Sequence, residues 1–142
     1  MTKDKALYQW FNHAVHDYTI RIVDGAAMDP TPTEHYIPAY PFTAVPEKAK
    51  TPYLTYTPVY SAWGEGAVSI TVNLWYRTKA EELLDAVVQE LSRRIGVGET
   101  IPCDGGYIWL KRGSPFAQPV ADPDPAIKRR YINITAEYMT AD

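Results

Sequence analysis

Hydrophobic and polar residues alternate with a period of two over residues 68–76, which is the pattern of a half-buried β-strand. The apolar members are Val68, Ile70, Val72, Leu74 and Tyr76. After this segment the apolar residues recur at the i, i+3, i+4 and i+7 positions of a helix as far as Ile95. Thr78 and Glu81 form a capping box at its start, and Gly96 suits its C-terminal cap. We therefore predict a strand followed by an amphipathic helix that packs on a sheet.

The remaining pattern predicts one further helix and several strands. Apolar residues spaced by one, three and four positions predict a helix over Lys3–His16. The alternating segments that predict strands are residues 52–60, 107–111 and 130–139, with a weaker candidate at 17–23. A turn at 63–66 joins the segment 52–60 to the strand from residue 67, so we expect these two strands to form an antiparallel hairpin.

Two proline-rich segments separate these elements. Residues 26–52 contain six prolines, each of which removes a backbone donor and biases the preceding residue toward extended geometry. This pattern predicts an extended arm or long loop. Aromatic and apolar residues between the prolines indicate that it packs on something rather than being disordered. Residues 114–125 are predicted to be a second loop, which leads into the last strand.

These elements predict an α+β fold in a single domain over residues 1–142. The expected core is a mostly antiparallel sheet of about four strands packed against an amphipathic helix, with an N-terminal helix and long Pro-rich loops. A chain of 142 residues with 46% hydrophobic side chains can build one core of this kind. The single cysteine, Cys103, excludes an internal disulfide.

Charge and hydropathy argue against several classes of function. The formal net charge is −3, so there is no overall basic field to attract DNA without regard to sequence. No apolar run approaches the roughly 20 residues of a membrane span, and the N-terminal residues lack the apolar segment of a secretory signal. We therefore expect a protein made and kept in the cytosol, with no membrane partner.

Histidine and cysteine do not form a recognisable metal or nucleophile pattern. His13 and His16 share a helical face and could bind a metal with Asp17 or His35. One cysteine and three scattered histidines do not supply the four spaced ligands of structural zinc, so solvated helix-end residues are the better interpretation. Cys103 has no activating histidine near it in sequence and is expected in a turn.

Other candidate motifs are equally incomplete. Ser114 lacks a Gly-x-Ser-x-Gly elbow, and the glycines at 105, 106 and 113 match neither a phosphate loop nor a dinucleotide fingerprint. Asp122 and Asp124 could bind calcium, but neighbouring prolines stiffen the segment and further ligands are not identified. Asn133 begins an Asn-Ile-Thr glycosylation pattern within a predicted strand, which we disregard. We predict no catalytic residue, no cofactor and no metal, and therefore not an enzyme.

The composition instead favours interaction surfaces. Eleven Tyr, four Trp and twelve Pro suit surfaces that must be both apolar and hydrogen-bonding. Residues 128–130 are three consecutive cations that could meet phosphate or an acidic patch on a neighbour, although most runs of this kind are merely solvated.

Four segments together resemble a known family. They are Pro52-Tyr53-Leu54-Thr55-Tyr56, Val72-Asn73-Leu74-Trp75-Tyr76-Arg77, the run of residues 106–116, and Arg130-Tyr131-Ile132-Asn133-Ile134. In their order and in the elements around them they resemble the tail terminator proteins of long-tailed phages and prophages, also called tail completion or minor capsid proteins. The resemblance covers nearly the whole chain and consists of strand and turn patterns rather than catalytic signatures.

The resemblance implies a ring, commonly of six copies, that sits on the finished tail tube in the virion after assembly in the host bacterial cytoplasm. Such a ring stops tube growth, presents a surface to the head connector or stopper protein, and lets DNA pass through its lumen without sequence-specific binding. A head-side neck or stopper component, or another head-tail connector, is the alternative. The residues expected to contact neighbouring subunits or partners are Tyr36, Tyr40, Phe42, Trp63, Glu65, Phe116, Lys128, Arg129 and Arg130; each aromatic could equally cover the domain's own core.

Overall fold

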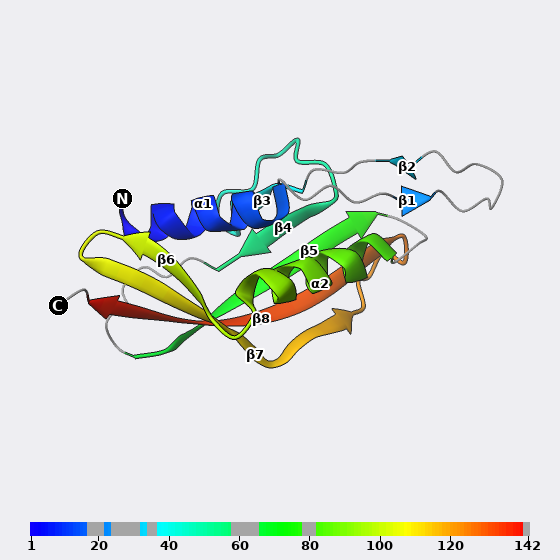
Figure 1. The fold of residues 1–142 in the computed structure, drawn as a ribbon. Coiled ribbons are helices and arrows are strands. Elements are labelled where there is room, and N and C mark those ends of the chain that lie inside the picture. Colours follow the sequence, from blue (N-terminus) through cyan, green and yellow to red (C-terminus); the bar gives the residue numbers. More distant parts are fainter. Residues whose placement is uncertain (17–21, 24–31, 34–36, 58–65, 78–81, 141–142) are drawn as a thin grey trace.

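The computed structural model describes residues 1–16, 22–23, 32–33, 37–57, 66–77 and 82–140. Two helices and eight strands lie within these ranges (Figure 1). In chain order they are α1 (Lys3–His16), β1 (Ile22–Val23), β2 (Pro32–Thr33), β3 (Ala39–Pro41), β4 (Tyr53–Tyr56), β5 (Val68–Arg77), α2 (Glu82–Ile95), β6 (Glu99–Cys103), β7 (Gly106–Val120) and β8 (Ile127–Thr140).

The main sheet of the described residues has six strands in the order β3-β4-β5-β8-β7-β6. Adjacent strands are antiparallel, except that β3 runs parallel to β4. The last strand in sequence, β8, lies in the middle, where it pairs with β5 on one side and β7 on the other. The predicted hairpin of β4 and β5 is confirmed, with Tyr53 opposite Trp75 and Tyr56 opposite Val72.

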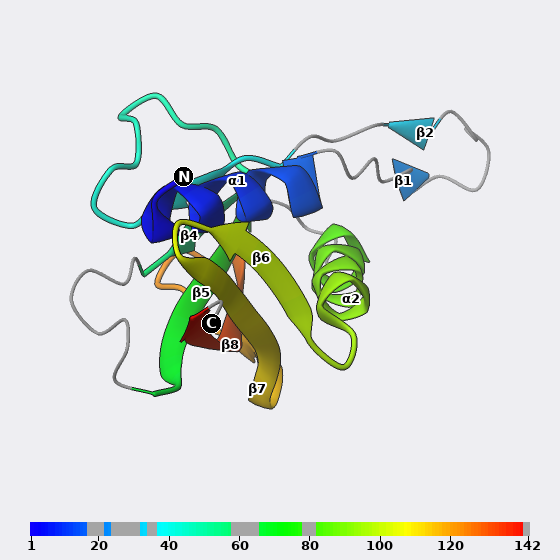
Figure 2. The same ribbon diagram turned by 60° about the vertical axis from the view of Figure 1, so that its left-hand side comes forward.

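Both described helices pack on one face of this sheet, which we call the inner face. Helix α1 contacts both edge strands, β3 and β6, because the sheet curls around it, and α2 lies beside α1 over β5, β7 and β8 (Figure 2). The core between them includes Leu7, Phe11, Ile70, Leu74, Leu84, Val87, Leu91, Ile108, Leu110, Ile132 and Ile134. Each large apolar side chain buried there favours folding by roughly 1.5–3 kcal/mol before entropy is counted.

The helix ends follow from local chemistry. Thr2 caps α1 by accepting a hydrogen bond from the Lys5 amide at 3.2 Å, and the predicted bounds of this helix are confirmed. Helix α2 ends at Ile95 and is followed by Gly96, whose φ of +56° is the left-handed conformation that a C-terminal cap needs. The predicted capping box at residues 78–81 lies outside the described residues.

Three sequence-based expectations about strands were wrong. The described sheet has six strands instead of about four, since β3 lies in the segment 26–52 expected to be a loop, and β6 was not foreseen. Cys103 ends β6 and pairs with Gly106, so it lies in a strand and not in a turn. Strand β7 continues to Val120, through most of the expected loop 114–125.

The prolines in β7 misled the sequence interpretation because they occupy a free edge. Beyond Leu110 strand β7 has lost its partner β6, so a proline there removes no ladder hydrogen bond on that side. The pairing of β7 with β8 shifts in register between Arg112 and Ala117. Phe116, within this irregular stretch, packs against the core.

Candidate interaction surface

The sheet face turned away from the described helices, here called the outer face, carries a mixed aromatic and polar set of side chains. This face can be assigned from the alternation of side chains along a strand. Alternate residues in the middle of β5 and β8 are buried on the inner face, so the residues between them point to the outer face. Its members include Tyr53, Thr55, Thr71, Asn73, Trp75, Tyr107, Trp109, Lys111, Arg129, Tyr131, Asn133, Thr135 and the acidic Glu137. Such a combination of aromatic and hydrogen-bonding groups is characteristic of binding surfaces.

One row of outer-face residues runs across β4, β5 and β8. Trp75 stands directly between Tyr53 and Arg129 in the strand register. The Arg129 guanidinium carbon lies 4.7 Å from the centre of the Trp75 ring, which is a cation–π distance. Tyr40, one of the residues expected to meet a neighbour, extends the row with its ring 6.0 Å from that of Tyr53. We call these four residues the aromatic strip.

A second stacked cation lies on β7. The Lys111 ammonium nitrogen is 3.7 Å from the centre of the Trp109 ring. The Trp109 indole lies against Gly98, where an added Cβ would collide with the ring nitrogen. The glycine thus permits the flat placement of the indole beneath the lysine.

The guanidinium of Arg129 is a candidate contact for a carboxylate. Its cation–π contact with Trp75 restricts the side chain, and a guanidinium suits the two oxygens of a planar anion. Two polar atoms of this region, Arg129 Nε and Asn73 Oδ1, are buried without a hydrogen-bond partner among the described residues. Unpaired buried polar atoms cost stability and often indicate a functional site.

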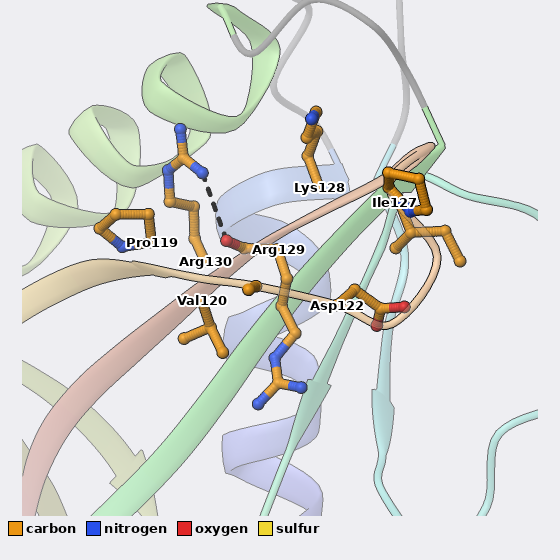
Figure 3. A pocket seen from close by; sticks show the side chains of 9 residues that line it. Pro119, Val120, Asp122, Ile127, Lys128, Arg129 and Arg130 are labelled. Carbon is orange, nitrogen blue, oxygen red and sulfur yellow. Dashed lines mark hydrogen bonds between the residues drawn. The ribbon is translucent and has the colours of Figure 1, made fainter.

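The cationic run 128–130 does not form a single anion site. Successive side chains of a strand point to opposite faces, and Figure 3 shows Lys128 and Arg130 on one side of β8 and Arg129 on the other. Arg130 is buried on the inner face, where its Nη2 lies 3.1 Å from Asp85 of α2. An open cavity of about 490 Å³ touches all three cations at the β7–β8 end. Because their charged groups diverge, the predicted phosphate contact has no common geometry here.

Strand addition is blocked along β3 and interrupted at Pro102 of β6, whereas β7 beyond Leu110 keeps a free edge. The outward backbone groups of Ala39 in β3 are bonded to the side chain of Asn12, with the Ala39 amide donating at 3.0 Å and its carbonyl accepting at 3.2 Å. Pro41 in β3 and Pro102 in β6 lack the N–H that a further strand would need. Association at the β3 edge must therefore use side-chain surfaces.

The other residues expected at interfaces divide into three groups. Phe42 is 56% exposed at the end of β3 and is available for contact. Phe116 is partly buried and packs against the core. Tyr36, Trp63 and Glu65 lie outside the described residues.

The candidate metal and nucleophile residues acquire no reactive surroundings in the described part. Within it, no cluster of three or more His, Cys, Asp or Glu side chains could hold a metal ion. Burial raises the pKa of the Cys103 thiol, which disfavours the reactive thiolate. The side chains of His13, His16, Asp17 and His35 lie outside the description.

The acidic pair expected as a calcium alternative instead shapes the turn between β7 and β8. Asp122 accepts a hydrogen bond from the Asp124 amide, and Asp124 accepts from the Ala126 amide at 2.9 Å and from Arg77 at 3.0 Å. The Ala126 amide, helped by Arg77, lowers the pKa of Asp124 below its usual value. Both carboxylates are thus used for local structure.

Comparison with known proteins adds no identification. No protein-family model matches the chain, and no curated protein matches it in sequence. Neither helix in the described ranges has the length and apolar character to cross a bilayer. The functional interpretation therefore depends on the residues and geometry described above.

Proposed function

We propose that the protein is a structural assembly protein of the phage virion, which forms a homo-oligomeric ring, commonly of six copies in the family it resembles, at the head-proximal end of the tail. The ring ends growth of the tail tube and provides the surface for head-tail joining. Its partners are copies of itself, the tail tube protein and the head connector or stopper protein. The observation that supports this proposal is a broad sheet face of aromatic and charged side chains on a domain whose β3 edge is blocked to strand addition.

This combination suits a ring more than a fibre or a catalyst. A closed ring needs two different complementary patches on each subunit, and each patch must be made of side chains if strand addition is blocked. The aromatic strip and the exposed ring of Phe42 supply one such area. The net charge of −3 suits a lumen through which DNA passes without being held.

A head-side neck or stopper protein remains the second candidate function, because it too would assemble by side-chain surfaces around the DNA path. Phage that lack this gene separate the two functions. A terminator mutant makes tail tubes of uncontrolled length, visible by electron microscopy. Normal-length tails that merely fail to join heads would refute the terminator role and favour the stopper.

Biochemical capping provides an independent test. The purified protein should bind one end of purified tail tubes and prevent further addition of tube subunits, followed by light scattering. Denatured protein serves as the control. A protein that binds neither tubes nor heads and remains a monomer in their presence would contradict both assembly roles.

A further inference from the structure

We propose that two copies of this chain pair through the free edge of β7, with their strands antiparallel about a two-fold axis at Gln118. The contact is separate from the proposed ring, because a two-fold contact uses the same patch on both copies and a ring uses two different patches. It joins two subunits, or two rings where rings have formed.

The edge of β7 is open beyond Leu110. Strand β6 pairs with β7 from Gly106 to Leu110, and after that point the described neighbour of β7 is β8 alone. In Figure 1 the end of β7 lies on the lower rim of the molecule. Gln118 and Pro119 are exposed there. An open edge of this kind pairs with an extended strand, because only a second backbone matches its spacing of N–H and C=O groups.

The phase of the sheet determines which backbone groups face this edge. The Tyr56 carbonyl accepts a hydrogen bond from the Phe42 amide at 2.9 Å, so the backbone groups of Tyr56 point to β3 and away from β5. Hydrogen-bonded and non-hydrogen-bonded pairs then alternate across the antiparallel strands. Tyr56 is a non-bonded partner of Val72, and Val72 is a bonded partner of Ile132. Ile132 is a non-bonded partner of Ala117, so the N–H and the C=O of Ala117 both point to the free edge.

This edge is complementary to itself. Pro119, two residues beyond Ala117, has the same orientation but offers only its carbonyl, since proline has no N–H. When two copies run antiparallel about Gln118, each Ala117 amide meets the Pro119 carbonyl of the other copy. No edge-facing N–H of residues 117–119 is then left unpaired, and unpaired N–H groups are the rarer defect in folded proteins.

Gln118 favours a second copy over a strand of another protein. On the axis it faces its own equivalent in a non-hydrogen-bonded pair, where Cα atoms are about 4.5 Å apart and side chains are close. A carboxamide contains both a donor and an acceptor, so two identical amides can bond each other reciprocally. The charged groups nearest to the axis are Arg129, diagonal to Gln118 on β8, and Asp122 in the turn beyond Val120. Their charges are opposite, so the contact depends on hydrogen bonds and not on net charge.

Charges placed on the two-fold axis test this contact in the full-length protein. The interface is small, so we expect the wild type to dimerise with a dissociation constant of about 0.01–1 mM, measured by sedimentation equilibrium. Gln118→Glu and Gln118→Lys should each weaken association at least about tenfold, because like charges then stand directly opposite each other. An equimolar mixture of the two variants should associate at least as tightly as the wild type, since glutamate then meets lysine.

Matched controls separate this effect from a general change in charge or stability. Gln9→Glu and Gln9→Lys, at an exposed position on α1, should associate like the wild type. The urea midpoint establishes that the Gln118 variants are folded. Amide exchange followed by NMR gives a measurement without substitution: the Ala117 amide should exchange more slowly at high protein concentration than at low concentration.

Three outcomes would overturn the proposed contact: a wild type that stays monomeric at about 1 mM, Gln118 variants that associate as the wild type does, or a variant mixture that stays monomeric. None of these decides the proposed function, which is judged separately by tail length and tube capping. A ring that forms normally in the Gln118 variants would leave the terminator role intact.

Discussion

The side chain of Asn12 occupies the position that a neighbouring strand would take, and its removal should destabilise the protein. Its amide nitrogen donates to the Ala39 carbonyl at 3.2 Å and to the Tyr8 carbonyl at 2.9 Å, while its oxygen accepts from the Ala39 amide at 3.0 Å. Ala39 is fully buried. In Asn12→Ala, two buried backbone groups therefore lose their partners.

The expected loss is large for a protein of this size. Each unpaired buried group costs about 1–3 kcal/mol, and the better helix propensity of alanine returns about 0.6 kcal/mol. For two such groups the net expectation is a decrease of about 1.5–5.5 kcal/mol in the free energy of unfolding. That corresponds to a fall of roughly 5–20 °C in melting temperature.

Urea unfolding followed by tryptophan fluorescence measures this change. The midpoint should fall while the slope with denaturant stays constant, since the same surface is exposed on unfolding. Gln9→Ala, an exposed change on the same helix, controls for helix propensity and should have little effect. A loss below about 0.5 kcal/mol in Asn12→Ala would refute the argument that this side chain satisfies the edge of β3.

Three further changes test the core, the outer face and the acid response. Ile134→Ala, at a fully buried position in β8, should lower the free energy of unfolding by about 2–5 kcal/mol in the same urea assay. Gly98→Ala should displace the Trp109 indole, seen as altered fluorescence, and destabilise because φ there is +155°. The hydrogen bond from Arg93 lowers the pKa of Glu90 below its ordinary 4.5, against the effect of burial. A carboxyl group whose pKa is lowered in the folded state stabilises the protein at pH values above its ordinary pKa, and this stabilisation is lost as the pH falls through the lowered pKa. Glu90→Gln should therefore be less stable than the wild type at neutral pH and should lose less free energy of unfolding on acidification.

Each of these predictions has a matched comparison. Thr135→Ala, beside Ile134 on the opposite face, should cost far less than the core change. Gly66→Ala also has a positive φ, +93°, but meets no atom within 4 Å, so it separates backbone strain from collision with an indole. Glu47→Gln, exposed, should leave the pH profile of stability unchanged. Equal effects within any pair would contradict the corresponding explanation.

Elements with a strong local period could be predicted from the sequence. The bounds of α1 were predicted to the residue, and the buried apolar positions of β5, β8 and α2 are those of their apolar stripes, joined by the buried charged residues Arg130 and Glu90. The failures lie where a pairing partner overrides the local signal. Prolines predicted loops, but β3 and the end of β7 accept them because those positions face a free edge.

The outer face was harder to foresee than the core. Trp109 and Lys111 lie two residues apart on one strand, so their sequence could have indicated that they share a face. Trp75 and Arg129 are 54 positions apart and meet through the register of β5 and β8, which no local pattern specifies. The divergence of the side chains of residues 128–130 has a related cause, since strand geometry turns alternate side chains to opposite faces.

The central place of β8 has a consequence for how the protein is made. The two parts of the sheet, β3-β4-β5 and β7-β6, are hydrogen-bonded to β8 and not to each other. While the ribosome is still translating residues 127–140, neither part can be joined to the other, so the nascent chain must wait with two exposed strand edges. Chaperone demand should therefore be highest just before this stretch leaves the exit tunnel, and a premature stop codon ahead of it should yield fragments that aggregate.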